Sequence, residues 1–285
     1  MTIVNSTQSE TVESQQRPAA LIAMADNLQD CDVAVMRRSM VIIRRLAHKI
    51  EAASVQELSE VVLNDPLMTL KVLACVAPIA YAKQATRPET VTAAILWMGL
   101  EPFFEHFLKT KIIEEELSAY PDALAAIRQV MLRSQRAANL AMGLAAQRND
   151  TDCSVVYETA LVNDFAEILL WQYWPKQAEQ IGQIRRGPPR VPSLDAQRQV
   201  LGFSLPQLTR ELLARWQMPR LMQRLADPAF EVDRQVLSVQ LGISMGRHLE
   251  SGWSHPEIIH DLEKIAAMLS ISLERARVIV DKIGA

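Results

Sequence analysis

Apolar residues recur every three or four positions over most of this chain, the spacing of helices with one buried face. Residues 91–98 carry a clear example, and Gly99 follows as a stop signal. No convincing stretch alternates apolar and polar residues as a half-buried strand does. The pattern therefore predicts an all-α fold made of many helices.

Local signals place the helices along the chain. Ser54 and Ser204 are each followed three residues later by Glu or Gln, which is the capping-box spacing, and Asp65-Pro66 suits a first helical turn. Residues 185–192 contain three prolines and a glycine, so we expect an exposed loop there without helix. Helices are predicted over residues 34–52, 123–147, 155–173, 175–184 and 235–249, with further starts near residues 54, 66, 91, 204, 254 and 272.

Composition narrows the class of protein. Hydrophobic residues make up 49% of the 285 residues, only 9 are glycine, and the net charge is −3, so neither nucleic acid nor a membrane is demanded as a partner. The three cysteines are far apart, which suits a reducing cytoplasm. We expect no signal peptide and no membrane span, because the longest apolar stretch, near residues 72–82, is too short. Residues 1–17 are polar and aperiodic and predict a disordered tail.

Two basic segments are candidate contacts for a partner. Within residues 34–52, most of the basic side chains lie opposite the apolar face. They form either a solvated face or a docking strip for an acidic partner. The predicted loop adds further exposed cations. The candidates are Arg37, Arg38, Arg44, Arg45 and Lys49 in the first segment and Arg185, Arg186 and Arg190 in the second.

Asn163 and Asp164 interrupt the apolar run of residues 160–171, which predicts a buried helix. Burying an amide beside a carboxylate is unfavourable unless both groups find partners. This pair is therefore the strongest indication of a functional or once-functional position in the chain.

Four segments, in order, resemble the HDOD domain, an HD-related module of bacterial signalling proteins. They are residues 61–73, 90–100 and 160–170, and Leu201-Gly202 with Trp216–Pro219. The resemblance covers roughly residues 20–285 and differs at Met98, where leucine is usual, and at Ala77-Pro78, where the family has an asparagine-serine pair. It implies a tail (1–17) and an HDOD domain (18–285) of two packed helical lobes, about 18–120 and 121–285.

The same resemblance implies that the metal ligands of HD enzymes are lost. Ser134 falls near the first histidine position, and Asn163 replaces the second, so only Asp164 remains. An asparagine offers a weak carbonyl oxygen where a histidine offers a ring nitrogen. Residues 225–228 lack a histidine pair, and residues 242–244 lack the terminal aspartate. We therefore expect no metal and no other cofactor.

Asp164 has two interpretations. As a structural relic, it accepts hydrogen bonds from backbone groups or from Ser134; as a functional residue, it binds a small ligand in the old metal pocket. Burial is expected to raise its pKa. The five histidines show no metal-ligand spacing, and no Cys-His pair is apparent.

The resemblance implies a non-enzymatic, cytoplasmic signalling or regulatory module that binds protein partners, with no catalytic residues. The alternative is a degenerate metal-dependent phosphohydrolase acting on a nucleotide or phosphodiester. A nucleic-acid-binding regulator is a third hypothesis, for which the basic segment at residues 37–49 would supply the phosphate contacts.

Overall fold

The structure is a computed structural model that describes residues 18–30, 32–82, 88–225, 230 and 232–284. Helices dominate these ranges, and no strand of a sheet occurs in them. One isolated parallel bridge joins Val35 to Ile112. The predicted all-α fold is confirmed. The predicted tail, residues 1–17, lies outside the described residues.

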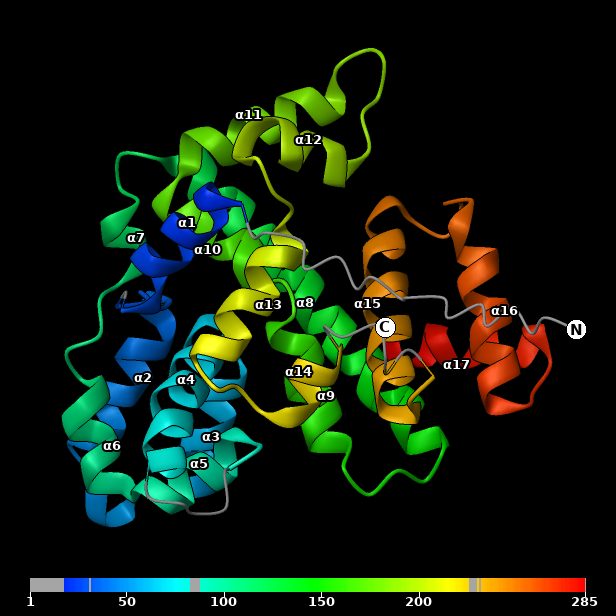
Figure 1. The fold of residues 1–285 in the computed structure, drawn as a ribbon. Helices are drawn as coiled ribbons and strands as arrows, with labels where there is room; N and C mark the ends of the chain where they lie inside the picture. Colours follow the sequence, from blue (N-terminus) through cyan, green and yellow to red (C-terminus); the bar gives the residue numbers. More distant parts are fainter. Residues whose placement is uncertain (1–17, 31, 83–87, 226–229, 231, 285) are drawn as a thin grey trace, which may run out of the picture.

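The N-terminal part consists of helices that pack into one large buried apolar cluster (Figure 1). The predicted caps form: Ser54 Oγ accepts from the Glu57 N–H at 3.1 Å, and Asp65 Oδ1 accepts from the Leu67 N–H at 3.0 Å. The elements are α1 (Ala19–Gln29), α2 (Arg37–Ala47), the 3-10 helix η1 (Ile50–Ala52), α3 (Val55–Leu63), α4 (Pro66–Ala82), α5 (Val91–Met98), α6 (Leu100–Phe107) and α7 (Ile113–Glu116).

The C-terminal part is organised around the 27-residue helix α8 (Pro121–Gln147), which contributes to all three buried clusters. Figure 1 shows α8 near the middle of the molecule, with α16 and α17 beyond α15. The remaining elements are α9 (Cys153–Val162), α10 (Phe165–Tyr173), α11 (Pro175–Arg186), α12 (Ser193–Leu201), α13 (Leu205–Arg215), α14 (Arg220–Leu225), α15 (Arg234–His248), η3 (Leu249–Ser251), α16 (Glu257–Leu269) and α17 (Leu273–Gly284).

Helix α15 packs against α8 at very short range. A Cβ atom on Gly242 would come within 2.7 Å of the Ala137 carbonyl oxygen and of the Ala141 amide nitrogen. One turn later, a Cβ on Gly246 would lie 3.2 Å from Ala137. Only glycine permits this approach at position 242, and the approach fixes how the residues that follow Gly246 lie relative to α8.

Three predicted helix boundaries need correction. The predicted helix over residues 155–173 is two helices, since a turn at Asn163 and Asp164 separates α9 from α10. The predicted helix over residues 34–52 begins only at Arg37 and ends at Ala47, and η1 follows it. Arg185 and Arg186 were expected in the loop but form the last turn of α11, because the first proline comes only at position 188.

The predicted boundary near residue 120 falls between α7 and α8. The largest buried cluster contains residues from both sides of it, such as Phe103 on α6 and Phe165 on α10. The proposed division into two lobes therefore stays a prediction, with a shared apolar core joining the two parts.

Two expectations from composition can be compared with the fold. Cys75 and Cys153 are free thiols, and Cys31 lies outside the described residues. Across the described ranges, no single helix has both the length and the apolar character needed to cross a bilayer. Residues 55–63 and 66–80 pass that test only as a pair, bent by 119° between them.

A buried carboxyl group links the two parts of the fold. Glu158 on α9 is 1% exposed, and its Oε2 accepts a hydrogen bond of 2.7 Å from the backbone N–H of Val91, the first residue of α5. Burial raises the pKa of Glu158 to about 8, and the hydrogen bond from Val91 opposes this only in part. The acid is therefore mostly protonated in the folded protein at neutral pH.

We expect Glu158 to make stability depend on pH. Because its folded pKa lies above the ordinary value of 4.5, its contribution is full below pH 4.5 and is lost as the pH rises to about 8. The loss is at most about 1.4 kcal/mol per pH unit. Glu158→Gln keeps the acceptor but cannot ionise, so urea unfolding from pH 5 to 8.5 should show the variant gaining on the wild type as the pH rises. A constant difference between the two proteins would contradict this assignment.

Candidate functional site

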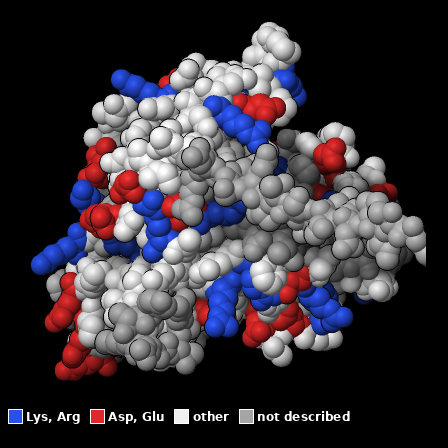
Figure 2. Space-filling view, viewed as in Figure 1, with Lys and Arg blue, Asp and Glu red and all other residues white. Residues whose placement is uncertain are grey.

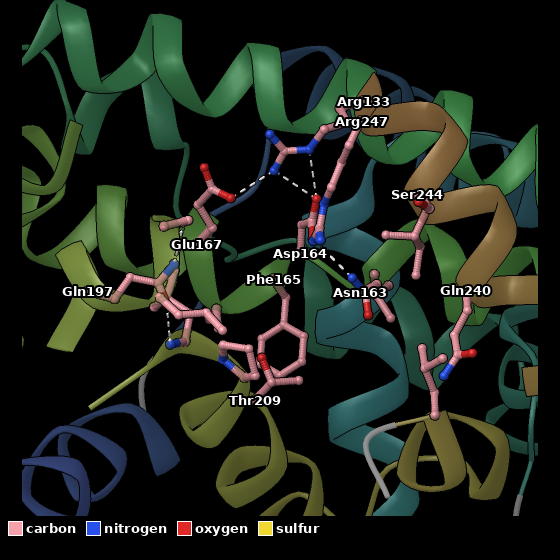
Figure 3. Close-up of a pocket in the computed structure, with 18 of the residues that line it drawn as sticks. Arg133, Asn163, Asp164, Phe165, Glu167, Gln197, Thr209, Gln240, Ser244 and Arg247 are labelled. Atoms are coloured by element: carbon pink, nitrogen blue, oxygen red, sulfur yellow. Dashed lines mark hydrogen bonds and ion pairs between the residues drawn. The ribbon is translucent and has the colours of Figure 1, made fainter. Parts of the chain in front are cut away.

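A cavity of about 990 Å³ opens beside the turn between α9 and α10. Its lining residues come from α12 and α13 on one side and from α15 and η3 on the other, with Arg133 of α8 between them. Figure 3 shows Asp164 and Phe165 in the middle of this lining, with Gln197 and Thr209 on one side and Gln240 and Ser244 on the other. The cavity thus contains the Asn163–Asp164 pair that the sequence singled out.

Two arginines bind the carboxylate of Asp164, one on each oxygen (Figure 3). Arg133 donates from Nε to Oδ2 at 2.8 Å, and a terminal nitrogen of its guanidinium lies 2.8 Å from the same oxygen. Arg247, from α15, donates to Oδ1. Asn163 also donates its side-chain amide to Oδ1, at 3.0 Å. The carboxylate is therefore fully occupied by donors from this chain.

Arg133 is the centre of a wider ion network. Its side chain is only 13% exposed and also contacts Glu167 at 2.7 Å and Glu250 at 3.7 Å. The network joins α8, α10, α15 and η3, and it contains two arginines and three acids. Such a buried, multiply paired guanidinium orders the helices around it, because its planar donors fix the positions of the carboxylates.

The pKa of Asp164 shifts in the direction opposite to the expected one. Burial by itself raises the pKa of this carboxyl, but the positive charges of Arg247 and Arg133 and their hydrogen bonds outweigh burial and hold the pKa below its usual value. Burial likewise opposes the charge of Arg133, and Asp164 and Glu167 raise the Arg133 pKa in return. Asp164 is thus a charged, paired group at neutral pH.

Ser134 does not bond to Asp164 as expected for a structural relic. The serine is 1% exposed, and its hydroxyl has no hydrogen-bond partner among the described residues. The neighbouring Arg133 takes that role, because successive residues point about 100° apart around a helix and Arg133 is the one that lines the cavity.

The residues around Asp164 do not fit a metal ion. Asn163 supplies only an amide, and both oxygens of Asp164 already accept from guanidinium groups. At the position expected for the terminal aspartate, Ser244 donates instead to Asp261 at 2.8 Å. Residues 226–229 lie outside the described residues. Within the described part of the chain, no group of three or more His, Cys, Asp or Glu residues could hold a metal ion.

Two of the histidines that line the cavity lie against each other. The rings of His248 and His255 stack with centroids 4.6 Å apart, and both residues line the cavity. His248 Nδ1 is 2.6 Å from a carboxylate oxygen of the buried Asp261. Sequence spacing did not reveal this pair, because His248 ends α15 whereas His255 lies in the connection between η3 and α16. The contact between the two rings therefore depends on the path of that connection.

A Cys-His pair, which the sequence did not suggest, forms on the N-terminal part. Cys75 Sγ on α4 lies 3.2 Å from His106 Nε2 on α6. Burial raises the pKa of the Cys75 thiol, although the charge of Lys71 lowers it in part. A raised pKa disfavours the thiolate, which is the nucleophilic form of cysteine.

The basic residues predicted to contact a partner lie in two regions, one near α2 and one near the end of α11. Arg37 is partly engaged, since its backbone N–H donates to Glu114 at 2.9 Å and its guanidinium lies 3.0 Å from Glu115. Figure 2 shows basic side chains interspersed with acidic ones on the face in view. Exposed cations for which the described residues provide no ion pair are Arg38, Arg44, Arg45 and Lys49 near α2, and Arg185, Arg186 and Arg190 near the end of α11.

Sequence reasoning missed the two arginines that neutralise Asp164. The available signal was the unfavourable energy of a buried carboxylate, which requires a cation nearby. The energy of burial indicates that Asp164 has a cationic partner, but it does not indicate which residue in the sequence provides the cation. Arg133 is 31 residues from Asp164, and Arg247 is 83 residues away on another helix.

Comparisons with known proteins place the fold. The HDOD domain family matches residues 35–229. Among solved structures, the MmoQ response regulator from Methylococcus capsulatus str. Bath matches with a TM-score of 0.68 and 18% identity, covering 90% of this chain and 99% of its own. A virulence factor from Campylobacter jejuni subsp. jejuni matches with a TM-score of 0.62 and 11% identity, covering 93% and 96% of the two chains. No curated protein matches the chain.

We expect Arg133 and Asp164 to depend on each other energetically. Arg133→Met should destabilise the fold by about 3–5 kcal/mol, because it leaves buried carboxylates with too few cations. Arg136→Met, on the same helix, should change stability by about 0.5 kcal/mol or less, since Arg136 has no ion pair among the described residues. Denaturant unfolding of each variant measures both values.

The combined variant Arg133→Met/Asp164→Asn separates this pairing from simple packing. If the two side chains neutralise each other, the double variant should lose clearly less stability than the sum of the single variants. Additive losses would show that the ion pair contributes nothing of its own.

Proposed function

The chain belongs to the HDOD family, since the family match spans more than half of its length, and we propose that it is a non-enzymatic binding module of a cytoplasmic bacterial signalling pathway. The HDOD family is related to the HD phosphohydrolases. In this chain the corresponding position lacks a donor set for metal catalysis, so the module acts by recognition.

The pairing of Asp164 with two arginines carries this proposal. In an HD enzyme a carboxylate at this position donates its electron pairs to a metal ion. Here the guanidinium groups of Arg133 and Arg247 take the place of the metal cation. Their hydrogen bonds already use both oxygens of Asp164. A metal would have to displace a buried ion pair, and among the described residues no group of three or more His, Cys, Asp or Glu side chains is arranged to complete its coordination.

A protein partner with an acidic segment fits the exposed face of α2. This face carries Arg37, Arg38, Arg44 and Arg45, with Val41 among them at 58% exposed. An apolar side chain surrounded by arginines suits an acidic helix that also offers an apolar residue, because the charges steer the encounter and apolar contact adds affinity. We call Arg37, Arg38, Val41, Arg44, Arg45 and Lys49 the basic strip.

The absence of metal chemistry is testable with the purified protein. After incubation with Mn²⁺ and desalting, elemental analysis should find far less than one metal ion per chain, in the wild type and in Asn163→His alike. Hydrolysis of p-nitrophenyl phosphate should stay at the background rate in both proteins, because one restored histidine leaves the other ligand positions empty. One Mn²⁺ per chain that disappears in Asp164→Ala, or activity gained by Asn163→His, would overturn the proposal.

The basic strip is testable by charge reversal. Arg44→Glu/Arg45→Glu should abolish capture of the partner from host extract, whereas the matched control Arg275→Glu/Lys282→Glu on α17 makes the same change in net charge and should capture it normally. The partner is identified by mass spectrometry, and its purified form should bind with an affinity that falls as salt rises. A partner that binds the strip variant as tightly as the wild type would refute the role of this surface.

A further inference from the structure

Several cations that line or rim the cavity are not matched by acids. Of the four arginines that line it, Arg133 is used by Asp164, Glu167 and Glu250. Arg185 on α11 and Arg210 on α13 are exposed, and the described residues give neither an ion pair. These two guanidinium groups therefore remain available to a ligand on the α11–α13 side.

Arg247 adds a third cation on the opposite side. Its side chain is 50% exposed, and one terminal nitrogen of its guanidinium contacts Asp164 Oδ1. A guanidinium has five N–H groups, so several of its donors can reach a ligand while the ion pair with Asp164 stays in place. The unmatched donors thus lie on both sides of the cavity, on α11 and α13 and on α15.

The lining also contains an unsatisfied hydroxyl. Thr159 of α9 is 1% exposed and lines the cavity, and its Oγ1 has no hydrogen-bond partner among the described residues. Buried hydroxyls are nearly always hydrogen-bonded in folded proteins. The Thr159 hydroxyl is itself inaccessible to solvent, so it is a buried polar atom beside the cavity and makes no direct contact with a ligand there.

Apolar side chains make up a little under half of the remaining lining residues. These apolar residues come from α9, α10, α12, α13, α14 and α15. The cavity volume of about 990 Å³ is at the upper end of the range for small-molecule sites. The apolar residues include Val162, Phe165, Leu194, Leu205, Leu213 and Ile243. A ligand that fills this space must present a hydrophobic body as well as a charge.

The geometry points to a binding site for a small organic anion with an aromatic or aliphatic body, held by Arg185, Arg210 and Arg247 over the Asp164 ion pair. This site goes beyond the proposed recognition of a protein partner and does not depend on the basic strip. The network around Asp164 forms part of its wall and keeps Arg247 in position. Since Arg247 and Arg210 come from opposite sides of the cavity, an anion that contacts both would link α15 to α13.

The probe for this site is 8-anilinonaphthalene-1-sulfonate, an aromatic anion whose fluorescence rises on binding. It should bind the native protein with saturation at one molecule per chain. N-phenyl-1-naphthylamine has the same rings without the sulfonate, and it should bind the native protein at least about tenfold more weakly than the sulfonate does. The sulfonate itself should bind the variant Arg185→Gln/Arg210→Gln at least about tenfold more weakly than it binds the native protein. Arg275→Gln/Lys282→Gln, on α17, should bind it like the wild type.

A second variant tests the location without removing charge. Thr209→Trp fills the space beside Phe165 in Figure 3 and should also weaken binding of the sulfonate. Thermal unfolding of each variant without dye shows that the fold is retained. Equal affinity for the charged and uncharged dyes, binding unaffected by the Arg185/Arg210 and Thr209 variants, or no saturable binding to the native protein would each overturn the inference.

Discussion

A carboxylate inside a helical core can stay charged only where cations meet it, because desolvation otherwise favours its protonated form. Asp164 lies at the turn between two apolar helices and is almost fully buried. In the related metal enzymes a divalent ion would satisfy this requirement. Here Arg133 and Arg247 satisfy it, and the helices that carry them are held in fixed positions as a result.

The packing of α15 on α8 makes this arrangement possible. Gly242 allows the two helix backbones to approach so closely that a methyl group at that position would collide with α8. Arg247 follows on the same helix, and Arg133 precedes the contact residue Ala137 by one turn of α8. Close backbone packing sets the distance between α8 and α15. At that distance Arg133 and Arg247 can both reach Asp164, so the packing and the ion network support each other.

Sequence patterns predicted the all-α class, the family and several helix starts, because these depend on residues near one another in the chain. Ser54 caps α3, and Gln207 accepts from the Ser204 N–H at 2.8 Å, as their spacing indicates. The same local signals missed the turn at Asn163, since the apolar run continues through it. They also missed the partners of Asp164 and the stacked His248 and His255, which only the tertiary fold brings together.

We propose that this cavity occupies the position of an HD site, with charge pairing among side chains in place of metal coordination. A crystal structure of the protein grown with Mn²⁺, with data collected at the manganese absorption edge, tests this most directly. We expect the guanidinium groups of Arg133 and Arg247 on the two oxygens of Asp164 and no anomalous peak beside them. An anomalous peak coordinated by Asp164, with Arg247 displaced into solvent, would contradict it.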